Sequence, residues 1–234
     1  MDPAAILDFI RATPPGGDVR AADDLVLFRV DKARFRYGQS YALLRGDRMV
    51  LVDAVHAATR AAVDRWRGTH APALLVLTHS DLVGQAFGPL GELSDWLGAP
   101  VLVHSADRPG GAGRPIEEAG DLLDAHGLSY AHVPGHTPGS VALYARPERY
   151  LFAGDAAVGP RYDDDAGGFT HPPIADADWP AFRAGWAAVD GPVSAVLPLH
   201  GRPALDVGGP SAASGQGFDA LRRDLLTPGN VMRA

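Results

Sequence analysis

Residues 131–155 read AHVPGHTPGSVALYARPERYLFAGD, and this stretch decides the fold. It contains two short apolar runs, VALY at 141–144 and YLFA at 150–153, and Gly, Pro and charged residues surround both of them. Runs of this length and punctuation are typical of buried β-strands. His136 stands in the glycine- and proline-rich loop before the first run, and Asp155 follows the second. The stretch therefore predicts two strands that present an imidazole and a carboxylate at their ends.

Two more apolar runs end in the same kinds of residue. LLVLT at 74–78 leads to His79 and Asp81, and SAVLPL at 194–199 leads to His200. Ligand sites in α/β proteins gather where strands end and loops project into one crevice. We therefore expect side chains from four distant segments to converge there. Imidazole and carboxylate groups are ligands that zinc, iron and manganese accept, so the pattern predicts a metal site. Its candidate ligands are His79, Asp81, His136, Asp155 and His200.

The order of the remaining elements predicts the architecture. After a short helix at 6–11, three strands come first, and helices and strands then follow each other along the chain. The expected strands cover 25–30, 40–44, 49–52, 74–78, 101–103, 130–133, 141–144, 150–153 and 195–197, and the later helices cover 57–66, 85–97, 116–126, 179–189 and 218–226. Such an order favours two packed sheets with helices outside, a four-layer αββα sandwich of the α/β class. The length suits one domain over residues 1–234.

Composition excludes several classes of site and partner. The chain has no cysteine, which excludes disulfides, Cys-ligated metals and a thiol nucleophile. The formal charge of −7 argues against a nucleic-acid partner, which rewards clustered Lys and Arg. No apolar run approaches the roughly 18 residues of a membrane span. The N-terminal MDPAAILDFIRATPPGG lacks the basic start and apolar run of a secretory signal, so we expect a cytoplasmic protein without membrane contact.

Four motifs resemble those of the metallo-β-lactamase superfamily. PGHTPGS at 134–140 is similar to a loop of that family, and LFAGD at 151–155 resembles its LFxGD segment, whose Asp bridges two metals. LPLHG at 197–201 resembles xPGHG, and LVD at 51–53 resembles the start of LIDTG. The match in order and spacing spans roughly residues 25 to 205. It implies the metallo-β-lactamase-like fold and a metal-dependent activity.

The family's leading motif, His-x-His-x-Asp-His, is degenerate in this chain. The corresponding segment is LTHSDLVG at 77–84. Without a gap, Leu77 stands for the first His and Leu82 for the third, while His79 and Asp81 are kept. With a two-residue deletion, His79 aligns with the first His and the second is missing. We prefer the ungapped alignment because it also places Gly84; in either alignment two imidazoles are absent.

The resemblance then implies an incomplete metal centre. One metal position would have His79, His136 and Asp155, and the other Asp81, Asp155 and His200. Three protein ligands plus water form the usual open zinc shell, so we expect a single or weakly bound divalent ion. Zinc is the first expectation, with iron and manganese as alternatives. His171 is a candidate substitute ligand, and Asp53 and His104 are candidates for supporting the ligands or contacting the substrate.

The implied activity is hydrolysis of a small ester, thioester, lactone or amide. A bound ion would make water more acidic, and Asp81 would orient or deprotonate that water. Two other functions stay open. The short His motif favours a degenerate member that binds a small molecule or a partner, and the same ligands suit an iron-dependent oxidoreductase. The sequence does not indicate the oligomeric state.

Overall fold

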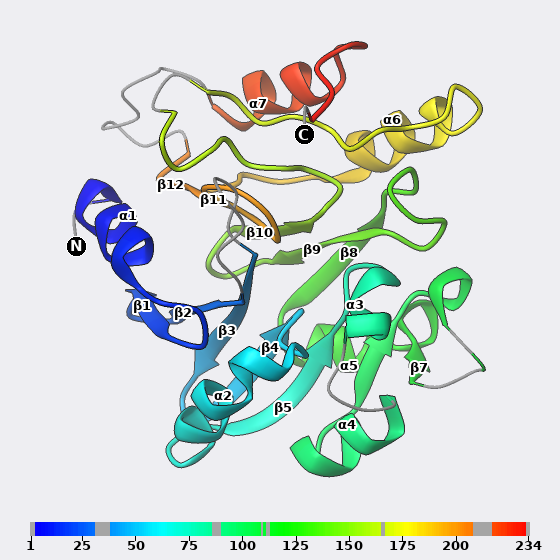
Figure 1. Cartoon of the computed structure of the whole chain (residues 1–234). Helices are drawn as coiled ribbons and strands as arrows, with labels where there is room; N and C mark the ends of the chain where they lie inside the picture. The colour runs from blue at the N-terminus through cyan, green and yellow to red at the C-terminus, as the bar shows by residue number, and fades with distance from the viewer. Residues whose placement is uncertain are drawn as a thin grey trace.

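The computed structural model describes residues 3–30, 38–85, 90–108, 110, 113–164, 167–207 and 217–232. Two β-sheets form its centre (Figure 1). The larger has seven strands in the order β1 to β7: Asp18–Ala22, Leu25–Arg29, Gln39–Arg45, Arg48–Val52, Ala71–Val76, Val101–Val103 and Arg114–Pro115. The smaller has the order β12-β11-β10-β9-β8: Ala204–Leu205, Ala195–Pro198, Tyr150–Gly154, Val141–Ala145 and Leu128–His132.

Each sheet combines a hairpin part with a parallel part. Strands β1 to β4 pair antiparallel, whereas β4, β5, β6 and β7 pair parallel. In the smaller sheet β8, β9 and β10 are antiparallel, and β10 pairs parallel with β11. The parallel strands send their carboxyl ends to one edge of their sheet, which is where the predicted ligands follow them.

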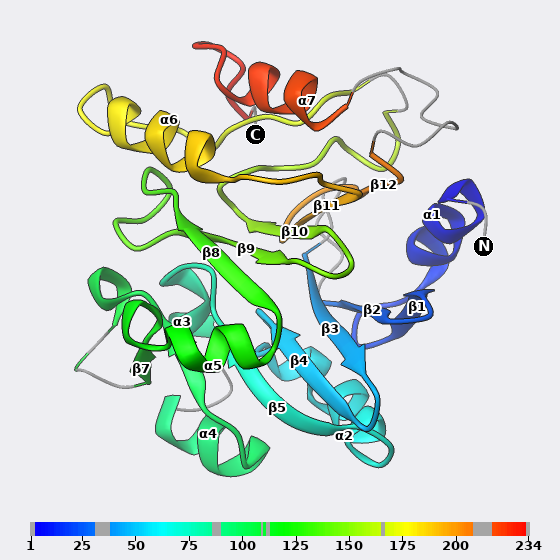
Figure 2. The same ribbon diagram turned by 180° about the vertical axis from the view of Figure 1, so that it is seen from behind.

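Helices cover the outer faces of both sheets (Figures 1 and 2). Helices α2 and α4 lie against the larger sheet, and α6 and α7 lie against the smaller one. Figure 2 shows α5 beside β8 at the edge. The helices are α1 Pro3–Ala12, α2 Arg60–Arg67, α3 Asp81–Gln85, α4 Leu90–Leu97, α5 Gly120–Ala125, α6 Trp179–Ala188 and α7 Phe218–Leu225, with 3-10 turns η1 Ala57–Thr59, η2 Ser105–Asp107 and η4 Ile116–Glu118.

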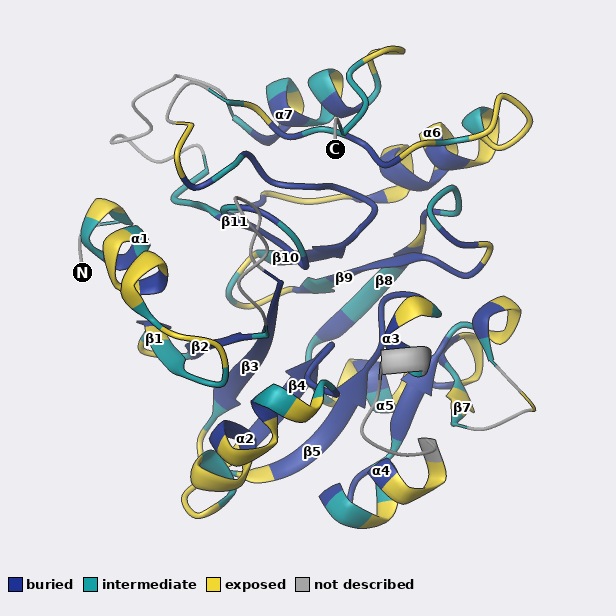
Figure 3. Ribbon diagram, viewed as in Figure 1, coloured by how far each residue is buried: buried dark blue, intermediate teal, exposed yellow. Residues whose placement is uncertain are grey.

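Three apolar clusters hold the layers together. The first lies between the sheets, where Leu43 and Val76 of the larger sheet join Leu143 and Phe152 of the smaller. The second fills the space under α2 and α4, and the third the space under α6 and α7. Strands β2 to β6 and β9 to β11 are mostly buried, whereas the helices alternate buried and exposed residues (Figure 3). This is the expected αββα sandwich, and apolar burial is its main source of stability.

Most expected elements appear with shifted ends, but four of the helices and strands were not expected. Strand β1 was not predicted because DVRAA contains no run of bulky apolar residues, and only one of its residues is buried. Helix α3 begins at Asp81, between the expected strand 74–78 and the expected helix 85–97, and strands β7 and β12 lie where no element was expected. The helix expected over 85–97 is α4 from residue 90 onward, and 86–89 lie outside the described residues.

Among the residues that the structure describes, no helix has both the length and the apolar character needed to cross a membrane.

Candidate metal centre

Strand ends from both sheets meet at one place. His79 and Asp81 follow β5 of the larger sheet, and Asp81 is the first residue of α3. His136 lies in the loop between β8 and β9. In the smaller sheet, Asp155 directly follows β10 and His200 is the second residue after β11. The sandwich thus closes with the carboxyl ends of β5, β10 and β11 on the same side.

The structure brings the five predicted ligands together. The Nε2 atom of His136 lies 3.2 Å from Oδ2 of Asp81 and 3.7 Å from Oδ2 of Asp155. That same Asp155 oxygen lies 3.6 Å from Nε2 of His79, and the two imidazole rings are 4.9 Å apart between centroids. Nδ1 of His200 contacts the other Asp155 oxygen at 2.8 Å. Whether each of these residues ligates a metal stays a prediction.

The donor atoms suit a divalent ion. Ligand atoms of His79, Asp81 and His136 all lie within 4.8 Å of one another. Metal–ligand bonds of about 2.0–2.2 Å place neighbouring donors of a tetrahedral shell roughly 3.3–3.6 Å apart, close to the contacts above. The Nε2 atoms of both histidines are buried and have no hydrogen-bond partner among the described residues. A buried polar atom left this way costs about 1–3 kcal/mol, which a bound cation would offset.

A relay of hydrogen bonds fixes the ring of His79. The Thr78 hydroxyl donates to Oδ2 of Asp53 at 2.8 Å, so its oxygen accepts from Nδ1 of His79 at 3.0 Å. This assigns the proton of His79 to Nδ1 and leaves a lone pair on Nε2, toward the site. Burial lowers the pKa of His79, and the nearby Asp155 carboxylate offsets only part of this lowering. The ring therefore favours its neutral, ligating form.

Asp53 supports this relay from beneath the site. Its Oδ1 accepts from the backbone N–H of Thr78 at 2.8 Å, and the side chain is buried. Burial raises the pKa of Asp53 to about 7, although the two hydrogen bonds from Thr78 act in the opposite direction. The residue therefore acts on His79 through Thr78 and does not touch the donor cluster.

Gly154 makes room for Thr78. Its φ is +53°, and a Cβ atom there would lie 2.2 Å from the Thr78 hydroxyl oxygen. Any other residue would therefore displace the side chain that orients His79. The glycine before Asp155 is thus explained by a close approach of two strand ends.

Asp155 is held ionised by its neighbours. Burial alone raises the pKa of this carboxyl, but the hydrogen bond from His200 and the nearby His79 and His136 outweigh burial and hold the pKa below its usual value. Because a carboxylate only accepts, Nδ1 of His200 is the donor in the 2.8 Å hydrogen bond to Oδ1. The Oδ2 atom is left to face the two imidazoles.

Two other predicted residues lie in different surroundings. The His104 ring stacks on His132 with centroids 4.1 Å apart, and its Nδ1 accepts from the backbone of Ala106. His171 is buried, donates from Nδ1 to the Pro172 carbonyl at 2.7 Å and meets Trp179 edge to face. These contacts do not join either ring to the donor cluster. Their proposed roles in substrate contact or substitute ligation gain no support from them.

The two leucines that the ungapped alignment places at histidine positions of the His-x-His-x-Asp-His motif belong to the core. Leu77 and Leu82 both pack in the apolar cluster between the larger sheet and its helices. Neither is more than 4% exposed. Both side chains therefore contribute to the apolar core.

Asp107, which was not among the predicted site residues, is buried next to the site at the end of η2. Its carboxylate accepts hydrogen bonds from Ser80 and Gly139, in the two loops that carry His79 and His136. The only signal in the sequence is an acidic residue four positions after the strand 101–103. Surface turns carry the same pattern, so it does not distinguish a buried carboxylate.

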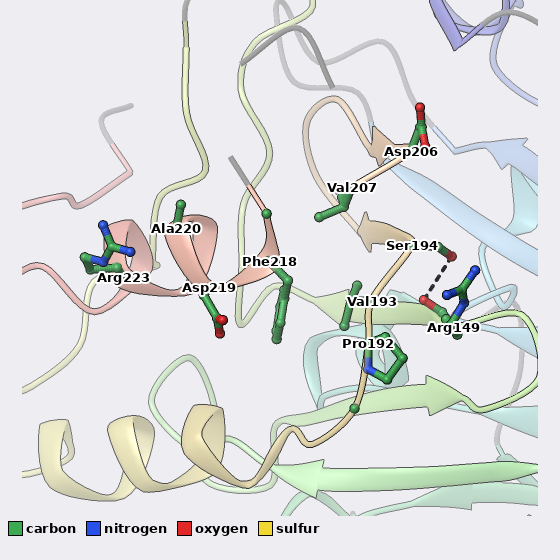
Figure 4. A pocket seen from close by; sticks show the side chains of 12 residues that line it. Arg149, Pro192, Val193, Ser194, Asp206, Val207, Phe218, Asp219, Ala220 and Arg223 are labelled. Carbon is green, nitrogen blue, oxygen red and sulfur yellow. Dashed lines mark hydrogen bonds between the residues drawn. The ribbon is translucent and has the colours of Figure 1, made fainter. Parts of the chain in front are cut away.

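A cavity of about 560 Å³ lies elsewhere in the molecule (Figure 4). Arg149 and Ser194, joined by a hydrogen bond in Figure 4, stand before β10 and β11, whereas Asp155 and His200 follow those strands. Strands of four or five residues separate the two places by about 13–17 Å. Phe218, Asp219 and Arg223 of α7 line its other side. The cavity is thus not part of the candidate metal centre.

Part of the chain matches a protein-family model, and the whole structure resembles several solved structures. Residues 86–199 match the family model described as "Metallo-beta-lactamase superfamily". This segment contains His136 and Asp155, begins after Asp81 and ends one residue before His200. No curated protein matches the chain.

Solved structures resemble the whole sandwich. A metallo-β-lactamase from Erythrobacter litoralis has 17% identity and a TM-score of 0.59, covering 89% of each chain. The metallo-β-lactamase FIM-1 from Pseudomonas aeruginosa, in a mono-zinc form, has 14% identity and a TM-score of 0.59, covering 92% of this chain and 96% of its own. One from Hirschia baltica has 14% identity and a TM-score of 0.57, covering 88% and 94%. At these identities the likeness shows the shared fold.

Proposed function

Since the chain belongs to the metallo-β-lactamase superfamily, we propose that it is a metal-dependent hydrolase acting on a small ester, thioester, lactone or amide. The observation that carries the proposal is the cluster of His79, Asp81 and His136, in which two buried Nε2 atoms have no hydrogen-bond partner within the described part of the chain. Neutral imidazole and carboxylate form a donor set suited to zinc, with iron or manganese as alternatives.

Different residues of the protein would hold the ion, accept a proton and orient the ligands. When bound, a divalent ion supplies Lewis acidity, which polarises a carbonyl oxygen and makes water more acidic. His79, His136 and Asp155 would hold the ion. Asp81 has a 55% exposed side chain, so it can reach a water or substrate from solvent and accept a proton at Oδ2. His200 would keep Asp155 ionised and oriented through its hydrogen bond.

A non-catalytic binding protein is the second candidate. The observation that favours it is the burial of Leu77 and Leu82, which leaves fewer imidazoles than the family's motif provides. In that case the same crevice would bind a small molecule or a partner without hydrolysing it. An iron-dependent oxidoreductase would use the same ligands as the first candidate and differs from it only in the metal and the reaction.

Elemental analysis separates these functions. Protein purified without added metal should contain zinc at up to one ion per chain. The metal-stripped and reloaded forms should then differ in rate on a panel of esters, thioesters, lactones and amides. His136→Ala should lose both metal and activity, with His70→Ala, in the turn after α2, as the control. Equal rates for stripped and reloaded protein would refute the hydrolase, and stoichiometric iron with oxygen consumption would favour the oxidoreductase.

A further inference from the structure

Asp107 is a buried carboxylate outside the donor cluster. It ends η2, which follows the buried strand β6, and is 5% exposed. Ionisable side chains are rarely buried to this degree unless hydrogen bonds compensate for the loss of water. The partners of this carboxylate therefore indicate what it does.

Three donors from two different loops converge on Asp107. Its Oδ2 accepts from the backbone N–H of Ser80 at 2.9 Å and from the hydroxyl of Thr137 at 2.5 Å. Its Oδ1 accepts from the backbone N–H of Gly139 at 2.8 Å. Ser80 lies between His79 and Asp81, and Thr137 directly follows His136. One carboxylate thus binds both loops that carry the donor cluster.

The hydroxyl protons around Asp107 have a fixed order. Because the Thr137 hydroxyl donates to the carboxylate, its oxygen is free to accept from the Ser140 hydroxyl at 2.8 Å. The Ser140 oxygen in turn accepts from the backbone N–H of Thr137 at 3.0 Å. The loop 137–140 is thereby closed on itself and then fastened to Asp107. Such a network is rigid because its members are buried and have partners.

Gly139 permits the close approach of this loop. A Cβ atom at residue 139 would lie 2.6 Å from Cγ of Asp107 and 2.9 Å from its backbone nitrogen. The second glycine of the PGHTPGS segment is therefore required by Asp107 and not by the donor cluster itself. The missing side chain at Gly139 leaves the space that the Asp107 side chain occupies.

We propose that Asp107 is a positioning residue that sets the distance between the His79–Asp81 loop and the His136 loop. This inference rests on the proposed function, since the separation matters for an ion that both loops must reach. Without the carboxylate, two backbone N–H groups would be buried without an acceptor, and each loop would shift to find another. His79 and His136, whose ring centroids are 4.9 Å apart, would then lose their spacing.

Asp107→Asn tests the proposal with little change in shape. The amide nitrogen of Asn would face the N–H of Ser80, a donor against a donor, while its oxygen could still accept from Gly139. Thr137→Val removes a single hydrogen bond to the same carboxylate. Glu148→Gln is the matched control, because Glu148 is another largely buried carboxylate with two N–H donors, both from Arg45, and it lies beyond the opposite end of β9 from the His136 loop.

Two measurements are made on each variant. Cobalt(II) alone is titrated into the stripped protein, and its visible spectrum reports affinity and geometry. We expect Asp107→Asn to weaken cobalt binding about 10- to 100-fold with an altered spectrum, as for other residues that orient metal ligands. Thr137→Val should weaken cobalt binding less. Glu148→Gln should leave the cobalt affinity and spectrum unchanged, even if it lowers the thermal stability as much as Asp107→Asn does.

Amide hydrogen exchange in the metal-free protein provides the second measurement. The amides of Val83 and Gly135 donate to the carbonyls of Ser80 and Thr137 within the two loops and do not bond to Asp107, so they report loop position indirectly. They should exchange at least tenfold faster in Asp107→Asn and stay unchanged in Glu148→Gln. Unchanged exchange, or cobalt affinity and spectrum equal to the parent protein, would overturn the proposal. If the parent protein itself takes up no cobalt, the proposed function fails and the exchange rates alone decide the role of Asp107.

Discussion

His200 donates from Nδ1 to Oδ1 of Asp155 across 2.8 Å, and this bond leaves Oδ2 facing His79 and His136. The two residues follow neighbouring parallel strands, β10 and β11, so the sheet itself sets their distance. Burial by itself would raise the pKa of Asp155, and this hydrogen bond is the main reason why the pKa is lowered instead. It also gives the histidine a role that does not require it to ligate an ion.

His200→Ala should therefore weaken metal binding without abolishing it. Removing the donor takes away the main interaction that keeps Asp155 ionised, and we expect a 10- to 100-fold loss of zinc affinity. His79→Ala should cost more, because it removes a donor atom. Competition with a chelator measures both. If His200→Ala lost the ion as completely as His79→Ala, His200 would be a ligand of equal standing.

Gly154→Ala should destabilise the protein more than Gly46→Ala. Both glycines have a left-handed backbone, with φ of +53° and +61°, so both substitutions carry a similar backbone strain of roughly 1–2 kcal/mol. Among the residues that the structure describes, the new Cβ at residue 154 meets the Thr78 hydroxyl at 2.2 Å, whereas one at residue 46 meets no atom within 4 Å. Urea unfolding of the metal-free variants compares the two free energies. Equal losses would show that the approach of Gly154 to Thr78 is not required.

Asp53 should make stability fall as the pH rises toward neutrality. Its pKa is about 7 in the folded protein and about 4 in the unfolded chain, so between these values the folded state holds the extra proton. Stability is then full below about pH 4 and declines through about pH 7, by at most roughly 4 kcal/mol. The lowered pKa of Asp155 acts in the opposite sense and at lower pH, where its contribution is lost as the carboxyl protonates.

The measurement is the urea midpoint of metal-free protein between pH 4.5 and 7.5. Asp53→Asn cannot ionise and should flatten the decline, whatever it does to stability at one pH. Asp47→Asn, in the hairpin turn between β3 and β4, serves as the control and should keep the slope. A parent protein with a flat or rising profile would contradict a raised pKa for Asp53.

Leu82→His should not restore a second metal position. The Leu82 side chain lies in the apolar cluster under α2 and α4, so an imidazole there would be buried without a partner. We expect a loss of about 2–5 kcal/mol in unfolding free energy and no gain in metal per chain. Leu82→Met keeps the volume and should cost less than about 1.5 kcal/mol. A histidine variant that bound an additional zinc ion would show that α3 can turn toward the site.

The sequence predicted which residues gather at the candidate site better than it predicted the individual helices and strands. Four apolar runs ending in His or Asp were enough to predict which residues meet, because strand ends gather at one edge in an α/β sandwich. His79, His136 and Asp155 converge as that rule requires. The same rule did not predict the position of the His104 side chain, which follows a strand but stacks on His132. Side-chain direction after a strand depends on the local turn, and the sequence pattern does not specify it.

Elements without an apolar signature were the ones missed. Strand β1 is held by its pairing with β2 and buries only Ala21 fully. Asp107 has the sequence context of an ordinary turn residue, and only the arrival of the loops at Ser80 and Gly139 makes it a shared acceptor. Contacts of this kind join segments 27 to 32 positions apart. No local pattern encodes them.

The sequence by itself determined the αββα class, the motifs that resemble the family and the choice of candidate donor residues, because periodicity and motif spacing are properties of short segments. Only the tertiary structure decided which donors face one another, that His200 hydrogen-bonds to Asp155, and that Leu77 and Leu82 lie in the core. The reason is physical: which atoms meet depends on how two sheets pack, and packing is settled by contacts between residues far apart in the chain.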